Sequence, residues 1–125
     1  MLRLATWALV TLSLAPASAL AAGLLASGPL TVQPGDVISC HVVNVGTKAA
    51  PGVQIDVVDI FEAPTVAATG TTDVAAGARA TVAFTVGKSP HEFYCRVTTQ
   101  KTAKALRGTF QVNDETGPIA SGEMR

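Results

Sequence analysis

The sequence predicts an all-β protein, a sandwich of two sheets with about seven strands. Short runs in which apolar and polar residues alternate recur along the chain, and a period of two is typical of half-buried strands. Gly, Pro, Asn and Asp separate these runs at intervals of roughly 8–12 residues. Two cysteines lie inside two of the runs, and helix signals are nearly absent.

Residues 1–21 have the pattern of a secretory signal peptide. Arg3 precedes an apolar run from Leu4 to Ala15, and small residues follow as APASALAA. We expect cleavage after Ala19 or Ala21. A proline and a serine end the run before the roughly 20 apolar residues that a membrane span needs. We therefore expect a periplasmic or secreted protein, with no membrane insertion after cleavage.

The remaining chain divides into a β-sandwich domain over 22–113 and a polar C-terminal tail over 114–125. For the tail, a disordered segment and a short edge strand both stay open. The whole sequence carries nine basic and nine acidic residues. That balance leaves no electrostatic footprint for nucleic acid. A domain this small often gains from a covalent staple, which an oxidising compartment permits.

The predicted strands follow in chain order. A brief strand around 30–33 ends at PGD, and DVISCHVVN ends at the turn NVGT. GVQIDVVD comes next, and TVAATGTTDV after it predicts a short edge segment. ATVAFTV, HEFYCRVTT and LRGTFQV alternate cleanly, and QKTAKAL lies where a hairpin between the last two strands is expected.

Both cysteines face the predicted core. Strand alternation puts Cys40 on the face of Ile38, and Cys95 on the face of Phe93. They lie on the second and the penultimate strands, which face each other from opposite sheets in an immunoglobulin-like sandwich. We expect one inter-sheet disulfide, which closes a loop of roughly 55 residues and stabilises the fold by about 4 kcal/mol in the chain-entropy model.

The stretches CHVVNVGT, EFYCRVT and ALRGTFQV together carry a resemblance. They resemble bacterial cell-adhesion-related, fibronectin-like domains and small secreted immunoglobulin-like proteins of Gram-negative bacteria. The resemblance covers most of the mature chain and implies the architecture. It implies no chemistry, because these motifs specify a turn, a disulfide and a strand.

Copper is the sharpest chemical alternative, because some exported β-sandwiches bind it with two histidines, a thiolate and a weak methionine. His41, His91, Cys95 and Met124 supply those residue types. No histidine or methionine follows Cys95 closely, and His41 points away from the face of Cys40. We expect no metal site and no cofactor.

Catalytic patterns are weak as well. Ser39 and His41 share a face, but no acid is placed to orient the imidazole, and no G-x-S-x-G motif is present. A group of acids lacks the loop spacing of a calcium site and predicts a solvated strand face: Asp56, Asp59, Glu62 and Asp73. We expect a protein that is not an enzyme.

Basic residues gather in the last two predicted strands and their turns. Two interpretations stay open. Arg96 could pair across strands with Asp56, an exposed contact worth about 0.2–1 kcal/mol. The group could instead form a ligand face, since sandwich loops and edges commonly bind partners: Arg96, Lys101, Lys104 and Arg107.

Some apolar residues break the strand alternation. Val43 and Val45 lie opposite the core face, and we expect the tail around Pro118 and Ile119, or another subunit, to cover them. A bulge in the third strand, near residue 59, would return Ile60 to the core.

The function expected from these features is that of an exported, non-enzymatic module with a binding or structural role. Its partner would be a protein or a cell-envelope component. The alternative is a periplasmic domain that handles copper or zinc.

Overall fold

The computed structural model describes residues 23–61, 63–101 and 103–125, so the predicted signal peptide and Glu62 lie outside the described residues. Nine strands and no helix occur in the described part. Their bounds are β1 (Gly23–Ala26), β2 (Leu30–Val32), β3 (Val37–Asn44), β4 (Ala50–Asp59), β5 (Thr65–Val74), β6 (Arg79–Thr85), β7 (His91–Thr99), β8 (Leu106–Asp114) and β9 (Gly117–Glu123). No helix long and apolar enough to cross a membrane is found there.

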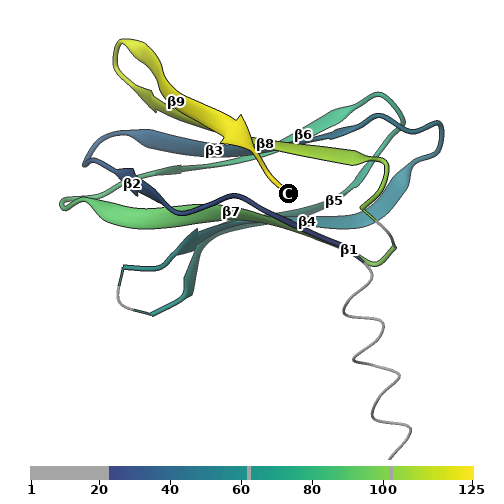
Figure 1. Ribbon diagram of the computed structural model, residues 1–125, viewed down its shortest axis with the longest axis horizontal. Helices are drawn as coiled ribbons and strands as arrows, with labels where there is room; N and C mark the ends of the chain where they lie inside the picture. Colours follow the sequence, from purple (N-terminus) through teal and green to yellow (C-terminus); the bar gives the residue numbers. More distant parts are fainter. Residues whose placement is uncertain (1–22, 62, 102) are drawn as a thin grey trace, which may run out of the picture.

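The strands form two antiparallel sheets stacked as two layers, as Figure 1 shows. The first, sheet A, has the order β1-β7-β4-β5, and β2 pairs with β7 beside β1. The second, sheet B, has the order β6-β3-β8-β9. The predicted all-β, two-sheet sandwich is confirmed, with more strands than the seven expected, because β1 is added and the tail forms the edge strand β9, one of its two open alternatives.

The core lies between the two inner faces, and the alternation of the sequence places it correctly. The predicted inward side chains of β3, β4, β7 and β8 are all buried: Ile38, Cys40, Val42, Val53, Ile55, Val57, Phe93, Cys95, Val97, Leu106, Phe110 and Val112. Cys40 in sheet B and Cys95 in sheet A form the predicted disulfide, with their Cα atoms 5.7 Å apart. It ties the centres of the two layers together.

The link between β7 and β8 corrects one expectation. These strands do not form a hairpin: β7 pairs with β1, β2 and β4, whereas β8 pairs with β3 and β9. Both edges of β7 are already occupied, so the chain crosses to the other sheet before β8. This departs from an immunoglobulin domain, in which the last strand joins the sheet of the penultimate one.

Strand β5 is longer than the short segment that we expected. It spans Thr65–Val74 and pairs with β4 at the edge of sheet A. The register shifts between Val57 and Val58, close to the bulge expected at residue 59. Ile60 nevertheless stays half-buried, because it follows the strand, where its N–H donates to the Glu92 carbonyl at 2.9 Å. The neighbouring Val58, on the outer face of the strand, is buried instead, at 1% exposed.

The C-terminal segment is an ordered part of sheet B. Strand β9 pairs with β8, and the Met124 side chain is 6% exposed. Met124 packs directly over Gly108, where a Cβ would lie 2.9 Å from its sulfur. The N–H groups of Arg125 and Ala26 each donate to the other's carbonyl, at 2.9 and 3.0 Å. The segment thereby joins sheet B to β1 of sheet A, as the end of the chain in Figure 1 illustrates.

The expected cover of Val43 and Val45 by Pro118 and Ile119 is wrong. Pro118 pairs with Asn113 near one end of β8, whereas Val43 lies opposite Arg107 near the other end. The register therefore keeps the two groups apart. Val45 is 56% exposed and Ile119 is 53% exposed.

The turn after β3 is organised by one buried side chain. Asn44 is fully buried, and its Nδ2 donates to the carbonyls of Lys48 and Val74 at 2.8 and 2.9 Å. Its Oδ1 accepts from the Gly46 N–H at 2.9 Å. A Cβ at Gly46 would lie 2.9 Å from the Cβ of Ala105, so this position needs glycine. The N-x-G pattern thus has a structural role, because Asn44 links its own turn to the end of β5 by hydrogen bonds.

Candidate functional site

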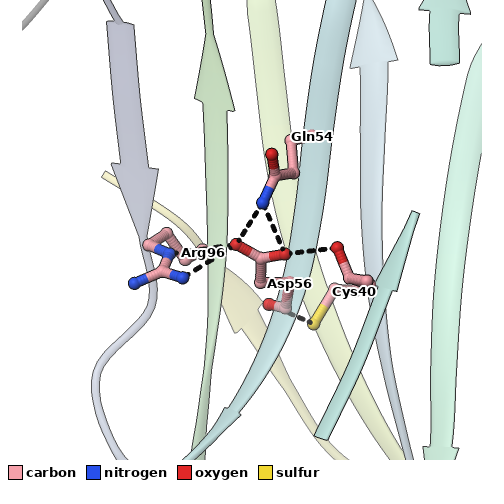
Figure 2. Close-up of polar contacts among 5 residues, drawn as sticks. Cys40, Gln54, Asp56 and Arg96 are labelled. Atoms are coloured by element: carbon pink, nitrogen blue, oxygen red, sulfur yellow. Dashed lines mark hydrogen bonds and ion pairs between the residues drawn. The ribbon is translucent and has the colours of Figure 1, made fainter. Parts of the chain in front are cut away.

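The first candidate is a buried carboxylate on the outer face of sheet A. Asp56 lies across the β4–β7 ladder from Arg96, and its side chain is 1% exposed. Arg96 donates from Nε and Nη2 to Asp56 Oδ2, at 3.1 and 2.9 Å. Thr69 donates to Oδ1 at 2.6 Å, and Gln54 donates to both oxygens at 3.1 and 3.2 Å. Figure 2 shows this cluster, and it confirms the predicted Asp56–Arg96 pair.

The charge on Asp56 is held by its neighbours. Burial alone would raise the pKa of this carboxyl, but hydrogen bonds from Thr69, Arg96 and Gln54, with the charge of Arg96, bring its pKa below the ordinary value. The bond to Asp56 likewise raises the pKa of Arg96. A carboxylate has about four lone-pair sites, and this one is filled from three sides. The cluster therefore stabilises the sheet and has no acceptor left for a ligand.

The disulfide lies directly below this cluster. Cys40 Sγ is 3.9 Å from the main-chain carbonyl oxygen of Asp56, the lower contact drawn in Figure 2. A disulfide sulfur carries no hydrogen, so this is a packing contact. Asp56 of β4 is therefore contacted on the outer face of the sheet by Arg96 and on the core side by the disulfide.

The four predicted ligand residues do not share one face. Arg96 alternates with the inward Cys95 and lies on the outer face of sheet A, bonded to Asp56. Arg107 alternates with the buried Leu106 and lies on the outer face of sheet B, where its Nη1 donates to main-chain carbonyls of 104 and 106 at 2.9 and 3.0 Å. Lys101 and Lys104 belong to the crossing between the sheets.

Lys104 and Arg107 do line one cavity of about 770 Å³, at the open side of the sandwich. Its other walls come from the start of β1 and from the chain end, including Leu24, Glu123 and Met124. The basic residues share this space with an acidic and an apolar wall. It has no single charge character.

A second site, which the sequence did not predict, lies at the end of β4, where one carboxylate binds a main-chain N–H and an imidazole that is stacked on a phenyl ring. The Asp59 carboxylate accepts two hydrogen bonds: Oδ1 from the Phe61 N–H at 2.9 Å and Oδ2 from His91 Nδ1 at 2.8 Å. The rings of Phe61 and His91 are stacked, with centroids 4.6 Å apart and planes 6° from parallel. We call these three residues the Phe61 platform.

The platform is supported from the core. The His91 ring stacks next on Phe93 at 6.1 Å, and Phe93 contacts Phe84 at 5.7 Å. Phe93 is 1% exposed and Phe61 is 58% exposed. A column of rings therefore runs from the core to the surface and fixes the orientation of the outermost ring.

A groove of about 470 Å³ lies beside the platform. It is lined by Asp59, Phe61, Ala63, Thr65, Ser89 and His91. Burial would raise the pKa of the Asp59 carboxyl, but the hydrogen bonds from the Phe61 N–H and His91, with the charge of His91 when protonated, lower it. The groove thus combines one exposed ring, an ionised carboxylate and short hydroxyl side chains.

The side-chain contacts around His91 follow the serine–histidine–aspartate order of a hydrolase triad, with Ser89 on one ring nitrogen and Asp59 on the other. Ser89 Oγ lies 3.3 Å from His91 Nε2, and the ring's other nitrogen is bonded to Asp59. In α/β-hydrolases the N–H of the residue after the nucleophile helps to bind the oxyanion. Here that residue is Pro90, which has no N–H. The contacts orient the imidazole, and Pro90 cannot supply that oxyanion donor.

The residues weighed for copper are dispersed. His41 lies on the outer side of sheet B, where Nδ1 is 2.9 Å from Thr81 Oγ1, and burial together with the charge of Arg79 lowers its pKa. His91 belongs to the Phe61 platform in sheet A, and Cys95 is in the disulfide. Across the described residues, no three His, Cys, Asp or Glu side chains gather as a metal site.

The sequence contained a faint signal for the platform. Asp59 ends a strand and Phe61 follows two residues later, and an Asp whose oxygen accepts the N–H two residues on forms a common turn. The stacking on His91 joins positions 30 residues apart in the sequence, which no local pattern encodes.

The comparisons with known proteins show no close relative. The chain matches no protein-family model, and no curated protein matches it significantly. A crystal structure of Thermotoga maritima 1070 is 10% identical, with 83% of this chain and 93% of that chain covered and a TM-score of 0.46. A DUF4466 family protein from Parabacteroides merdae is 14% identical, with coverages of 82% and 43% and a TM-score of 0.40. The CBM22-1-GH10 modules of a Clostridium thermocellum xylanase are 16% identical, with coverages of 73% and 17% and a TM-score of 0.38. Likenesses at this level carry no argument about function.

Proposed function

We propose that this protein is an exported, non-enzymatic binding module that recognises a cell-envelope component or an envelope protein through the Phe61 platform. The observation that carries the proposal is the exposed ring of Phe61, whose main-chain N–H is held by Asp59 and whose ring stacks on the column of rings beneath it. A side chain that is ordered before binding loses little conformational entropy on binding, and rigid aromatic anchors commonly dominate binding energy.

The disulfide supports the same proposal. A disulfide persists in oxidising compartments, which agrees with the predicted signal peptide and a periplasmic or secreted location. Together with the Asp56–Arg96 cluster, it gives the sandwich a rigid scaffold for a surface site. The copper or zinc alternative has less support, since His41 and His91 lie on different sheets.

The test is co-sedimentation of the mature domain with Gram-negative envelope fractions, using purified sacculi and outer-membrane vesicles in parallel. We expect wild-type protein to co-sediment with one fraction and Phe61→Ala to lose about tenfold or more in affinity, a hot-spot effect. Ile119→Ala is the matched control, because Ile119 is similarly exposed on the other sheet, and it should bind like wild type. Equal binding by Phe61→Ala and wild type, or no binding by either, would overturn the proposal.

A further inference from the structure

We propose that the Phe61 platform is a subsite for a neutral pyranose ring of an oligosaccharide. This inference rests on the binding function proposed above and names the class of ligand. It combines three features of the groove: an available ring face, a rim of hydroxyl and imidazole groups, and a carboxylate whose two oxygens are already bonded.

The ring face is the first feature. His91 stacks flat against one face of Phe61, and the residue is still 58% exposed, so the opposite face and the edge are open to solvent. The face of an aromatic ring carries negative charge density, which attracts the polarised C–H groups on one side of a pyranose. A fixed aromatic ring suits the C–H side of a rigid pyranose chair.

The rim is the second feature. Thr65 and Ser89 place hydroxyl groups beside the ring, and His91 presents Nε2 toward Ser89 at 3.3 Å. The Thr65 hydroxyl donates to the Ala63 carbonyl at 3.2 Å, which leaves its oxygen able to accept. Sugar hydroxyls both donate and accept, so they match a rim made of groups that do the same.

Asp59 selects the charge of the ligand. Its carboxylate is ionised at neutral pH, which disfavours a uronic acid or an acidic peptide by like-charge repulsion. The Phe61 N–H and His91 already fill two of its roughly four lone-pair sites, which leaves fewer of them for a cationic ligand. A neutral ring that stacks on Phe61 and bonds along the rim satisfies both conditions.

The size of the groove agrees with a small ligand. Its volume of about 470 Å³ falls in the range of roughly 300–1,000 Å³ typical of small-molecule sites. The groove lies at the end of the sandwich beside the β4–β5 connection, so a longer saccharide could extend past it into solvent.

The experiment is an NMR titration of the mature domain, with soluble β-1,4-linked oligosaccharides of glucose and of N-acetylglucosamine as probes. We expect saturable shifts of the Phe61, Ser89 and His91 amides with at least one probe. Phe61→Ala should weaken binding tenfold or more, whereas Phe61→Trp, which keeps a larger ring face, should bind at least as well as wild type. Ile119→Ala should leave the affinity unchanged. An unchanged spectrum outside the groove shows that each variant is folded.

The outcomes separate the two proposals. If neither saccharide shifts these amides or competes with the envelope fraction, while envelope binding still depends on Phe61, the saccharide class is wrong and the binding function stands. If choline or an oligogalacturonate shifts the groove amides and the neutral probes do not, the charge argument is wrong and the inference falls. If no envelope fraction binds either, the proposed function falls with it.

Discussion

Asp56 and Arg96 form an ion pair of 2.9 Å across the β4–β7 ladder, with the aspartate side chain 1% exposed and the arginine 32% exposed. The pair lies on the outer face of a sheet, where a solvated contact was expected. Gln54 and Thr69 donate hydrogen bonds to the carboxylate and help to shield it from solvent, so the pair expected at the surface is half-buried. Burying a charged pair carries a desolvation penalty, and leaving one of its charges unpaired is strongly destabilising.

Removing the arginine should therefore be costly. Arg96→Leu leaves a buried carboxylate without its cation, and we expect the free energy of unfolding to fall by about 2–4 kcal/mol. Urea denaturation measures this loss. Arg107→Leu, at an exposed arginine of the other sheet, should stay within about 0.5 kcal/mol of wild type.

The double variant checks the cause of that loss. Asp56→Leu/Arg96→Leu removes both charges and should be less destabilised than Arg96→Leu alone, because no unpaired buried charge remains. If the double variant lost as much free energy of unfolding as Asp56→Leu and Arg96→Leu lose together, the two residues would not be coupled.

Acid should weaken the fold through Asp56. Its pKa is lower in the folded protein than the value of about 3.9 for an unfolded chain, so folding favours the ionised form. The stability it adds is present in full above about pH 5 and is lost as the pH falls through the folded pKa. Urea midpoints between pH 7 and pH 3 should fall more steeply for wild type than for Asp56→Asn. Parallel curves would contradict this origin of the acid sensitivity.

The buried amide after β3 provides another test. Asn44→Asp keeps the acceptor for the Gly46 N–H but places a carboxylate against the carbonyls of Lys48 and Val74. We expect it to destabilise the fold at pH 7 by about 2–4 kcal/mol, through lost donors and a buried charge. Thermal unfolding measures this effect, and a midpoint equal to that of wild type would show that these two bonds are dispensable.

The C-terminal strand should contribute to the core, although it covers neither Val43 nor Val45. Deleting residues 117–125 removes the buried Met124 and uncovers Phe110, which is 8% exposed and packs on Gly122. The expected loss is about 2–4 kcal/mol, from the apolar surface returned to water. An unchanged unfolding midpoint would show that β9 is not part of the cooperative unit.

The sequence predicted the features of this fold that depend on local periodicity. Alternation around Cys40 and Cys95 placed both on inner faces, and their strands proved to lie in opposite sheets. The pairing of β8 with β3 could not be predicted in this way, because β-strand partners depend on which edges are free in the whole sheet. The same limit left β9 undecided between an edge strand and a disordered tail, because its Gly-Pro-Ile-Ala-Ser-Gly sequence has little strand character.

The candidate site was harder to predict than the fold. Arg96 was correctly paired with Asp56, since both were expected on neighbouring strands. The Phe61 platform was missed because its parts come from the end of β4 and the start of β7, and each part taken alone has an ordinary explanation. Only the pairing of these strands brings Asp59 opposite Phe93 and so places His91 near Phe61.

The intact mass of the protein recovered after export tests most directly the claim that this chain is an exported sandwich closed by one disulfide. We expect a mature chain that begins at Leu20 or Ala22, whose mass rises by two hydrogen atoms on reduction. An alkylating reagent should add to neither Cys40 nor Cys95 before reduction, and to both afterwards. A protein that retains Met1, or one in which both cysteines are alkylated without a reductant, would contradict this claim.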